Sequence, residues 1–487
     1  MRFIKHSLSP ALCQRDVSPV FRLQLGCLAA AGLMEFLFII TGGLFFNWTI
    51  YYLVETYLLI PAVLFLGATL SQYRELSTQA RRQLFLCIGM AVWFIITQVF
   101  HRAMGMEAKS IAMFFGVYLI ALPFASASDD GAKQKGLKLI AWLFIAASIT
   151  LVFYSAMLKF QFLPAALSPY IYWDGARLYA LWHPNGCACL FMIGIVLCLG
   201  FFFRSRQLWQ KCLLIVCVVL QFWGLSLTHS RTSTFLACGL VSGILFFTIW
   251  KGGWKRFLIA LAAALILFPS LYFTSEKLFS AHNAQLIRQY TQQAEQAAAQ
   301  EAASGASEQS APAASSKPDL KLNEDGYLQG TLSYQESLSG NLRTLNGRTG
   351  LWKTALTALR DDRLLLLFGT EYPGQVLYTY GSYTTGSCHN SWLEITLHMG
   401  LPGLLAALVL TVYALVNAFT VLWKRENMWQ VCIALLTLGL LAAGFLESLL
   451  FTADDSCHFF SFLFLILVGY LSQWRKSVQK NAPSTAP

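Results

Sequence analysis

The chain has 487 residues, of which 56% are hydrophobic and only 12% are charged, and its formal net charge is +11 at pH 7. This composition is too apolar for a soluble protein of several domains, so it indicates a polytopic membrane protein. The positive charge lies mainly in short connections between apolar runs, and it gives no sign of a nucleic-acid partner.

Apolar runs long enough to cross a bilayer, of about 17 to 25 residues, recur along the chain. We therefore expect an all-α polytopic membrane protein with about twelve transmembrane helices. The predicted spans, in chain order, are 26–46, 50–70, 84–100, 110–125, 138–158, 181–203, 212–228, 233–250, 256–273, 401–422, 429–450 and 456–474.

The positions of Lys and Arg predict which side of the membrane each connection faces, because cytoplasmic loops retain positive charge. If the N-terminus is inside, the basic residues gather in the cytoplasmic connections, for example at Arg81, Arg82 and 251–256. Few fall in the short connections that would be outside. The pattern predicts that both termini are cytoplasmic. We expect no cleavable signal peptide, since the basic N-terminus leads into a full-length span.

The longest interruption of the apolar pattern is predicted to be a large extracytoplasmic loop, residues 274–390, between the ninth and tenth spans. It separates residues 1–273, which carry spans one to nine, from residues 391–475, which carry spans ten to twelve. Residues 476–487 would form a cytoplasmic tail. The chain therefore has one large extracytoplasmic segment in which to build a site.

Two parts of this loop differ in composition. Residues 291–320 are rich in Ala, Gln and Ser and cannot bury a core, so we expect a flexible segment whose early Ala/Gln part tends to be helical. Residues 341–372 are predicted to be helical. Apolar residues from Leu351 to Leu359 recur there at helical spacing and predict an amphipathic helix that lies on the membrane or across the spans.

Titratable residues gather on the predicted outer side. Apart from His6, the histidines fall in outer connections or outer halves of spans: His101, His183, His229, His282, His389, His398 and His458. Membrane interfaces tolerate histidine, so any one of these positions alone indicates little. Taken together, they favour polar chemistry at the extracytoplasmic face.

Arg231 lies where one apolar span turns directly into the next. A cation this deep costs about 2.5–3.5 kcal/mol on insertion scales unless it reaches water or an anion. It is therefore either an arginine that extends to the outer headgroups or part of an anion site.

Arg348 follows Asn346 and Gly347 at the start of the amphipathic helix, where its guanidinium and nearby backbone amides would face an anion together. A solvated arginine in a first helical turn is the alternative. Farther along, Glu394 and His398 are four residues apart on one helical face and predict a local contact.

Several other residues are left with open interpretations. Cys388 and Cys457 each precede a histidine, and they are either unpaired thiols, a disulfide or part of a metal site. Glu35 and Glu55 are acids within or near the first two spans, which is unusual, but the sequence assigns neither a role.

Local motifs carry a resemblance to a known family. Its elements are His389-Asn390 followed after nine residues by Gly400-Leu401-Pro402-Gly403, together with Ser230-Arg231-Thr232, Gly347-Arg348 before Leu351-Trp352, Phe368-Gly369, and His183-Pro184-Asn185. In this combination the chain resembles the O-antigen ligase and polymerase superfamily. These bacterial membrane glycosyltransferases move a glycan from an undecaprenyl diphosphate carrier.

The resemblance implies an enzyme of the bacterial cytoplasmic (inner) membrane with an extracytoplasmic active site. Its donor would be an undecaprenyl-diphosphate-linked glycan, its acceptor a glycan, lipid or protein, and it would need no cofactor and no metal. His389 would be the catalytic base. The diphosphate- and substrate-binding residues would be Arg231, Arg348, Asn390, His183 and Asn185.

These residue types suit the chemistry. A sugar that leaves a lipid diphosphate releases a stable anion, which guanidinium groups bind through forked hydrogen bonds. The incoming hydroxyl benefits from a base, and an ordinary histidine, with a pKa of about 6.5, can accept its proton.

Three alternatives remain open from the sequence. Ligase and polymerase activities use the same donor group and are not distinguished. A transporter or flippase of lipid-linked oligosaccharides would carry charged or broken segments near mid-membrane. A structural or sensory membrane protein would leave Arg231 and the His389 motif unexplained.

Overall fold

The computed structural model describes residues 19–44, 48–76, 78–100, 130–159, 172–174, 177–179, 184–304, 348–370, 373–383, 387–451 and 458–481. The helices in these ranges are α2 (Pro19–Leu44), α3 (Trp48–Ser71), the short 3-10 turn η2 (Tyr73–Glu75), α4 (Thr78–Phe100), α6 (Asp130–Lys159), α7 (Pro184–Arg204), α8 (Leu208–Thr228), α9 (Arg231–Ile249), α10 (Trp254–Ser304), α11 (Arg348–Asp361), α12 (Arg363–Phe368), α13 (Pro373–Gly381), α14 (Ser391–Lys424), α15 (Met428–Leu446) and α16 (His458–Asn481). One antiparallel ribbon, β1 (Tyr172–Asp174) with β2 (Arg177–Tyr179), lies beside the turn between α8 and α9.

Within the described ranges, eight helices are long and apolar enough to cross a membrane: α2, α6, α7, α8, α9, α10, α14 and α15. Shorter apolar stretches lie in α3, α4 and α16. The predicted class, an all-α polytopic membrane protein, is confirmed. The total of twelve spans stays a prediction, because the fourth predicted span (110–125) lies outside the described residues.

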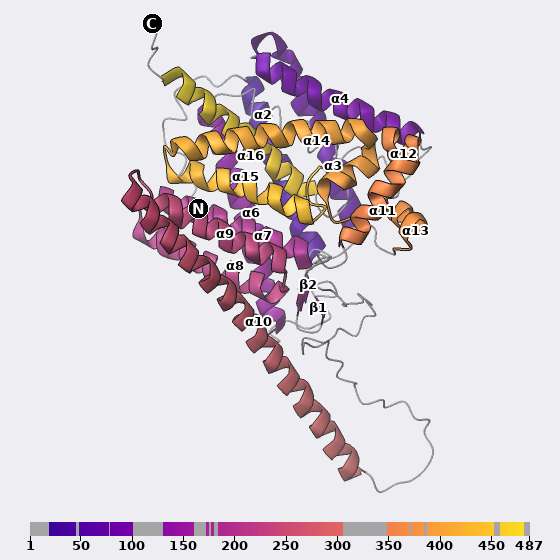
Figure 1. Ribbon diagram of the computed structural model, residues 1–487, viewed down its shortest axis with the longest axis vertical. Helices are drawn as coiled ribbons and strands as arrows, with labels where there is room; N and C mark the ends of the chain where they lie inside the picture. The colour runs from indigo at the N-terminus through magenta and orange to yellow at the C-terminus, as the bar shows by residue number, and fades with distance from the viewer. Residues whose placement is uncertain are drawn as a thin grey trace.

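The centre of the bundle is α7, which packs against α6, α8, α9 and α15 (Figure 1). Nearly its whole surface is buried, because small residues let neighbouring helices approach closely. At Gly194 the helix passes the hydrogen-bonded side chains of Gln221 and Ser148, and at Gly200 it passes the Trp429 ring. The first residues of α7 are thereby fixed against the end of α15.

Helix α10 is longer than its predicted span, which ends at residue 273, because it continues as one helix to Ser304 and projects beyond the bundle (Figure 1). The expected helical tendency of the early Ala/Gln part of 291–320 is confirmed, and residues 305–320 lie outside the described ranges. Residues 291–304 are therefore helical. They are rich in Ala, Gln and Glu, which are strong helix formers, and contain no Gly or Pro.

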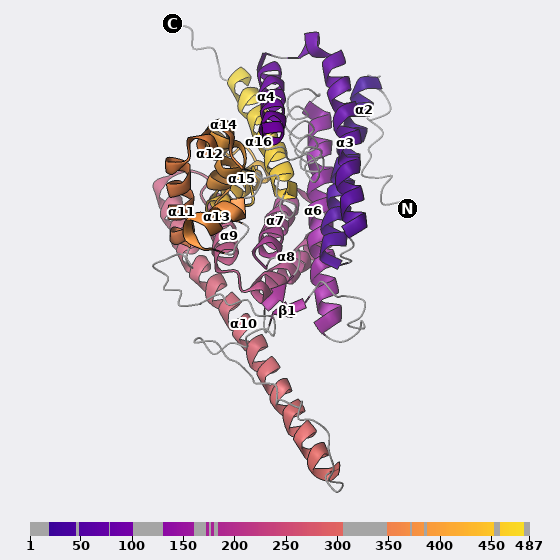
Figure 2. The ribbon, with the colours of Figure 1, turned by 90° about the vertical axis from the view of Figure 1, so that its right-hand side faces the viewer.

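A compact cap of three short helices, α11, α12 and α13, flanks α14 (Figure 2). Its own small core contains Leu351, Ala355 and Leu377 and is separate from the core of the bundle. The predicted helical stretch 341–372 contains two helices, α11 and α12, rather than one. Helix α11 ends before Asp362, and the Asp362 side chain caps α12 by accepting from two backbone N–H groups, at 2.8 and 3.0 Å.

The cap meets α14 where that helix is broken. Gly400 has a φ of 67° and a ψ of −162°, and Gly369, just after α12, has a φ of 74°. A Cβ on Gly400 would meet the backbone of Leu367, and a Cβ on Gly369 would meet the backbone of His398. Two of the sequence motifs therefore meet through a backbone contact that only glycine allows. This contact sets the position of the first segment of α14.

We expect Gly400→Ala and Gly369→Ala to destabilise the protein, by about 1–3 kcal/mol for the left-handed backbone alone, with the backbone overlap adding to it. Thermal unfolding in detergent measures the effect. Gly89→Ala in α4 is the matched control, since a Cβ there has open space. Unfolding midpoints of the two variants equal to that of the control would contradict this account.

Candidate active site

The candidate site is built from two turns locked together by hydrogen bonds. The first, residues 387–391, leads into α14, and the second, residues 447–451, follows α15. Asn390 is the N-cap of α14, because its side-chain oxygen accepts from two backbone N–H groups of the first helical turn, each at 3.0 Å. Its amide nitrogen donates to the carbonyl oxygen of Phe445 at 3.0 Å. Asn390 thus ties the start of one helix to the end of another.

Ser391 makes the second link between the turns. Its buried Oγ donates to the carbonyl oxygen of Glu447 at 3.0 Å and accepts from the N–H groups of Leu449 and Leu450, at 3.1 and 2.9 Å. These bonds define the path of the second turn, so the direction of the Glu447 side chain depends on the turn that carries His389.

His389 itself has a left-handed backbone, with a φ of 50°. Non-glycine residues rarely adopt this conformation, although histidine is among the more tolerant, and such residues cluster at functional sites. The ring Nδ1 lies 3.0 Å from Oε2 of Glu447. The side chain keeps 27% of its surface exposed. One edge of the imidazole is therefore held by a carboxylate while the residue remains accessible.

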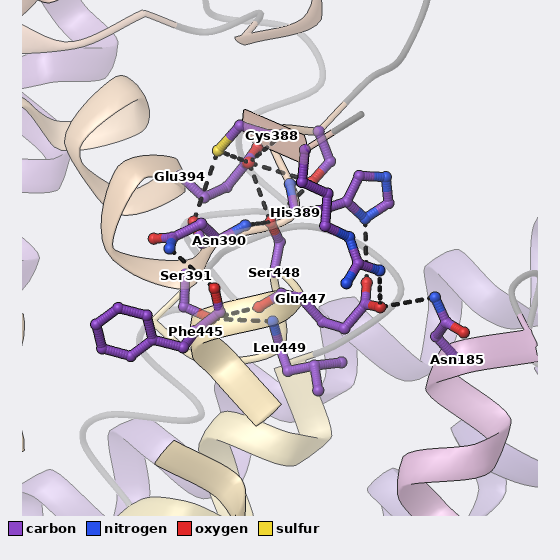
Figure 3. Close-up of polar contacts among 12 residues, drawn as sticks. Asn185, Cys388, His389, Asn390, Ser391, Glu394, Phe445, Glu447, Ser448 and Leu449 are labelled. Atoms are coloured by element: carbon purple, nitrogen blue, oxygen red, sulfur yellow. Dashed lines mark hydrogen bonds and ion pairs between the residues drawn. The ribbon is translucent and has the colours of Figure 1, made fainter. Parts of the chain in front are cut away.

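Glu447 is the point where the site converges (Figure 3). Arg348 Nη2, from α11, forms an ion pair with its Oε1. Asn185 Nδ2, from the first turn of α7, donates to the same oxygen at 2.7 Å. Only 5% of the Glu447 side chain is exposed, and 11% of the Arg348 side chain. Because a buried charge needs a partner, Glu447 and Arg348 depend on each other.

Sequence reasoning found three of these four residues but missed Glu447. Arg348, His389 and Asn185 lie in motifs, whereas Glu447 follows an apolar run and precedes an ordinary Ser-Leu-Leu stretch. The sequence signal that could have found Glu447 was its position at the end of a membrane span, where an unpaired acid is energetically costly.

A second carboxylate, Glu394, lies below the first turn and is 1% exposed. Its Oε2 accepts from the N–H of Cys388 at 2.9 Å and from the thiol of Cys388 at 3.0 Å. Burial, with the Glu394 charge adding to it, raises the pKa of the Cys388 thiol well above its ordinary value. Cys388 is therefore a neutral free thiol. His398 Nε2 lies 3.7 Å from Oε1 of Glu394, which is the local contact predicted.

Arg231 lies apart from these contacts. In the packing of α9 on α15, Gly439 faces Leu240 and Gly243 faces Leu435, so the helices are antiparallel and the start of α9 is level with the end of α15. Arg231 is thus at the same end of the bundle as Glu447. It is exposed, and its charge acts on Glu276 of α10.

The remaining residues singled out from the sequence have varied outcomes. His183, Cys457 and the side chain of Glu55 lie outside the described residues. Glu35 is paired in the bundle with His458, whose Nε2 is 2.8 Å from Oε2 of Glu35. Both side chains are buried.

Fold and site together define a polytopic α-helical membrane protein with an arginine, a histidine and a carboxylate converging at one end of its bundle. Residues 216–408 match the family model described as O-antigen ligase. This match confirms the predicted resemblance to the O-antigen ligase and polymerase superfamily over that part of the chain. A search of curated proteins finds no match. The matched segment contains Arg231, Arg348 and His389 but not Glu447.

The ion pair between Arg348 and Glu447 gives a testable prediction. Removal of one partner leaves a buried charge, so Arg348→Ala and Glu447→Ala should each destabilise the protein, by up to about 3–5 kcal/mol. The double variant removes both charges and should lose less than the sum. Thermal unfolding of the four proteins in detergent measures this, and additive losses would contradict a direct pair.

Proposed function

We propose that this protein transfers a glycan from an undecaprenyl diphosphate carrier to an acceptor hydroxyl or amide at the outer face of the inner membrane. The observation that carries the proposal is the convergence of Arg348, His389 and Asn185 on Glu447. An outer-face enzyme has no access to cytoplasmic sugar nucleotides, so a membrane-borne donor is the consistent choice.

His389 is the proposed base. Glu447 binds Nδ1, which assigns the ring proton to that nitrogen and directs Nε2 toward substrate. The acceptor oxygen attacks the anomeric carbon and gives its proton to Nε2. At the same time the bond from the anomeric carbon to the phosphate oxygen breaks, and its electron pair leaves with the diphosphate. General-base assistance of this kind is typically worth about 10²- to 10⁴-fold.

The two arginines stabilise the leaving diphosphate. A guanidinium has five N–H donors, so Arg348 can hold Glu447 on one edge and bind phosphate oxygens with another. Arg231, at the same end of the bundle on α9, is exposed and supplies the second cation. Negative charge that develops on the diphosphate is thereby met by preorganised donors.

The polar residues around this centre have different proposed roles. Asn185 holds the Glu447 carboxylate. The Asn390 side chain is engaged in capping α14 and in its bond to Phe445, so we assign it to positioning the His389 turn rather than to contact with substrate. His183, two residues before Asn185, remains a proposed substrate-binding residue.

A transporter shares one feature with this structure, a broken helix, because α14 is interrupted at Gly400. In a transporter such a break lines a substrate site. Here the backbone of α12 packs against the break. The break therefore has a structural explanation, and we favour the enzyme.

The proposal predicts that His389→Ala and Arg231→Ala each abolish glycan transfer while leaving expression and membrane insertion near normal, because the first change removes the proposed base and the second removes a cation proposed to bind the diphosphate at the same end of the bundle. The measurement is complementation of a deletion strain, with surface glycan analysed on gels. Thr396→Val, a buried change in α14 whose hydroxyl bonds its own helix, is the control. Full-length product from a well-expressed His389→Ala protein would reject the base assignment.

Arg348→Lys tests whether the forked N–H donors of the Arg348 guanidinium are needed. An ammonium keeps the charge but cannot hold Glu447 and a phosphate through one planar group, so transfer should fall by more than tenfold, about 1.4 kcal/mol or more. Initial rates with purified lipid-linked donor measure this. Arg360→Lys, on the exposed end of α11, should leave the rate unchanged. Equal rates for both variants would show that Arg348 acts only as a point charge.

Surface glycan from the deletion strain also separates the two forms of the reaction. Single repeat units that remain attached while long chains are lost identify a polymerase. Long chains that accumulate on the carrier identify a ligase.

A further inference from the structure

The buried carboxylate of Glu394 is not used in the chemistry above, yet it contacts both turns of the site. Ser387 Oγ lies 3.2 Å from its Oε2 on the first turn, and Ser448 Oγ lies 3.1 Å from the same oxygen on the second. The two hydroxyls are 2.7 Å apart. Ser448 directly follows Glu447, and Ser387 lies two residues before His389. Glu394 therefore contacts the residue next to Glu447, which holds the imidazole, and a residue of the turn that carries the imidazole.

The hydrogen bonds around these hydroxyls are consistent with a single direction. Ser448 Oγ accepts from the N–H of Asn390 at 3.2 Å, and Ser387 Oγ accepts from the N–H of His389 at 3.1 Å. Each hydroxyl has one proton to donate. If Ser448 donates its proton to Glu394, then Ser387 can donate its own proton to Ser448. Each hydroxyl then donates one hydrogen bond and also accepts. One oxygen of Glu394 thus orders a chain that ends at the backbone of His389.

This chain of hydrogen bonds supports the backbone conformation of His389. The left-handed backbone of His389 persists only where its surroundings favour it. The N–H of Cys388, bound to Glu394, and the N–H of His389, bound to Ser387, are the two amides that lead into the bend at His389. Without the acceptor at Glu394, the Cys388 amide loses its partner, and the hydroxyls of Ser387 and Ser448 lose the acceptor that orders their direction.

We propose that Glu394 is a positioning residue, which acts through Ser387 and Ser448 to align the His389 ring with the Glu447 carboxylate. This inference rests on the proposed function, because it assigns to His389 the role of base. Glu394 touches neither donor nor acceptor. It acts on the alignment of the base, and a misplacement of about 1 Å can lower a rate by about 10²-fold.

The experiment compares Glu394→Gln with Glu394→Leu in steady-state transfer assays with purified full-length protein and lipid-linked donor. Gln retains an acceptor oxygen at this position, whereas Leu fills similar space without one. We expect Leu to lower kcat by about 10²-fold with little change in the KM for donor, since Arg231 and Arg348 are untouched. Gln should stay within about tenfold of the wild type.

A residue that only fills the core would give the opposite order. Leu would then match or exceed Gln in kcat, and this result would overturn the proposal. Any loss of stability in Glu394→Leu is separated by expressing kcat per folded protein, measured by gel filtration. Thr396→Val, the buried polar position half a turn farther along α14, is the matched control and should retain both kcat and KM.

A coupling measurement completes the test. If Glu394 acts through Ser448, then Ser448→Ala should lower kcat less in the Glu394→Leu background than in the wild type. Equal factors in both backgrounds would remove Ser448 from the path and overturn the proposal. A wild-type protein without transfer activity would instead reject the proposed function, so the two failures are distinguishable.

Discussion

A carboxylate that is almost fully buried at the end of an apolar bundle has to be compensated, and the site follows from this constraint. Glu447 is compensated by an arginine, an imidazole and an amide that come from three separate parts of the chain. Because the charge of Glu447 is stable only with these partners, the same interaction holds the cap, the His389 turn and α7 together. A single ionic centre thus serves the fold and presents the groups that we propose to be reactive.

The geometry of this centre depends on how α14 is supported. Its first segment, which carries the His389 turn at its start, ends at Gly400, where the backbone of α12 packs into the break. The cap that begins with Arg348 is therefore placed by contacts more than one helical turn from His389 and Glu447. This explains why glycines recur among the motif residues: they permit a close backbone approach.

The spans and motifs could be read from the sequence because each depends on local pattern. Apolar length predicted the helices, and the motifs that carry the family resemblance predicted that Arg348, His389 and Asn185 belong to one site. The apolar pattern predicted only the membrane span of α10, up to residue 273, whereas the Ala, Gln and Glu residues that follow continue the helix to Ser304. Asn390 was predicted to bind substrate, yet its side chain is engaged in capping, a use that its position before a helix also favours.

By itself the sequence determined the class of protein, its apolar helices, its family resemblance and most of the residues at its polar end, because hydropathy and short motifs are properties of neighbouring residues. Only the tertiary structure decided that Glu447 is the shared partner, that Glu394 lies beneath the turn, and that Arg231 stands in a separate group of side chains. These facts depend on which helix ends meet. Residues separated by 58 and 99 positions come into contact through packing, and no local pattern encodes that distance.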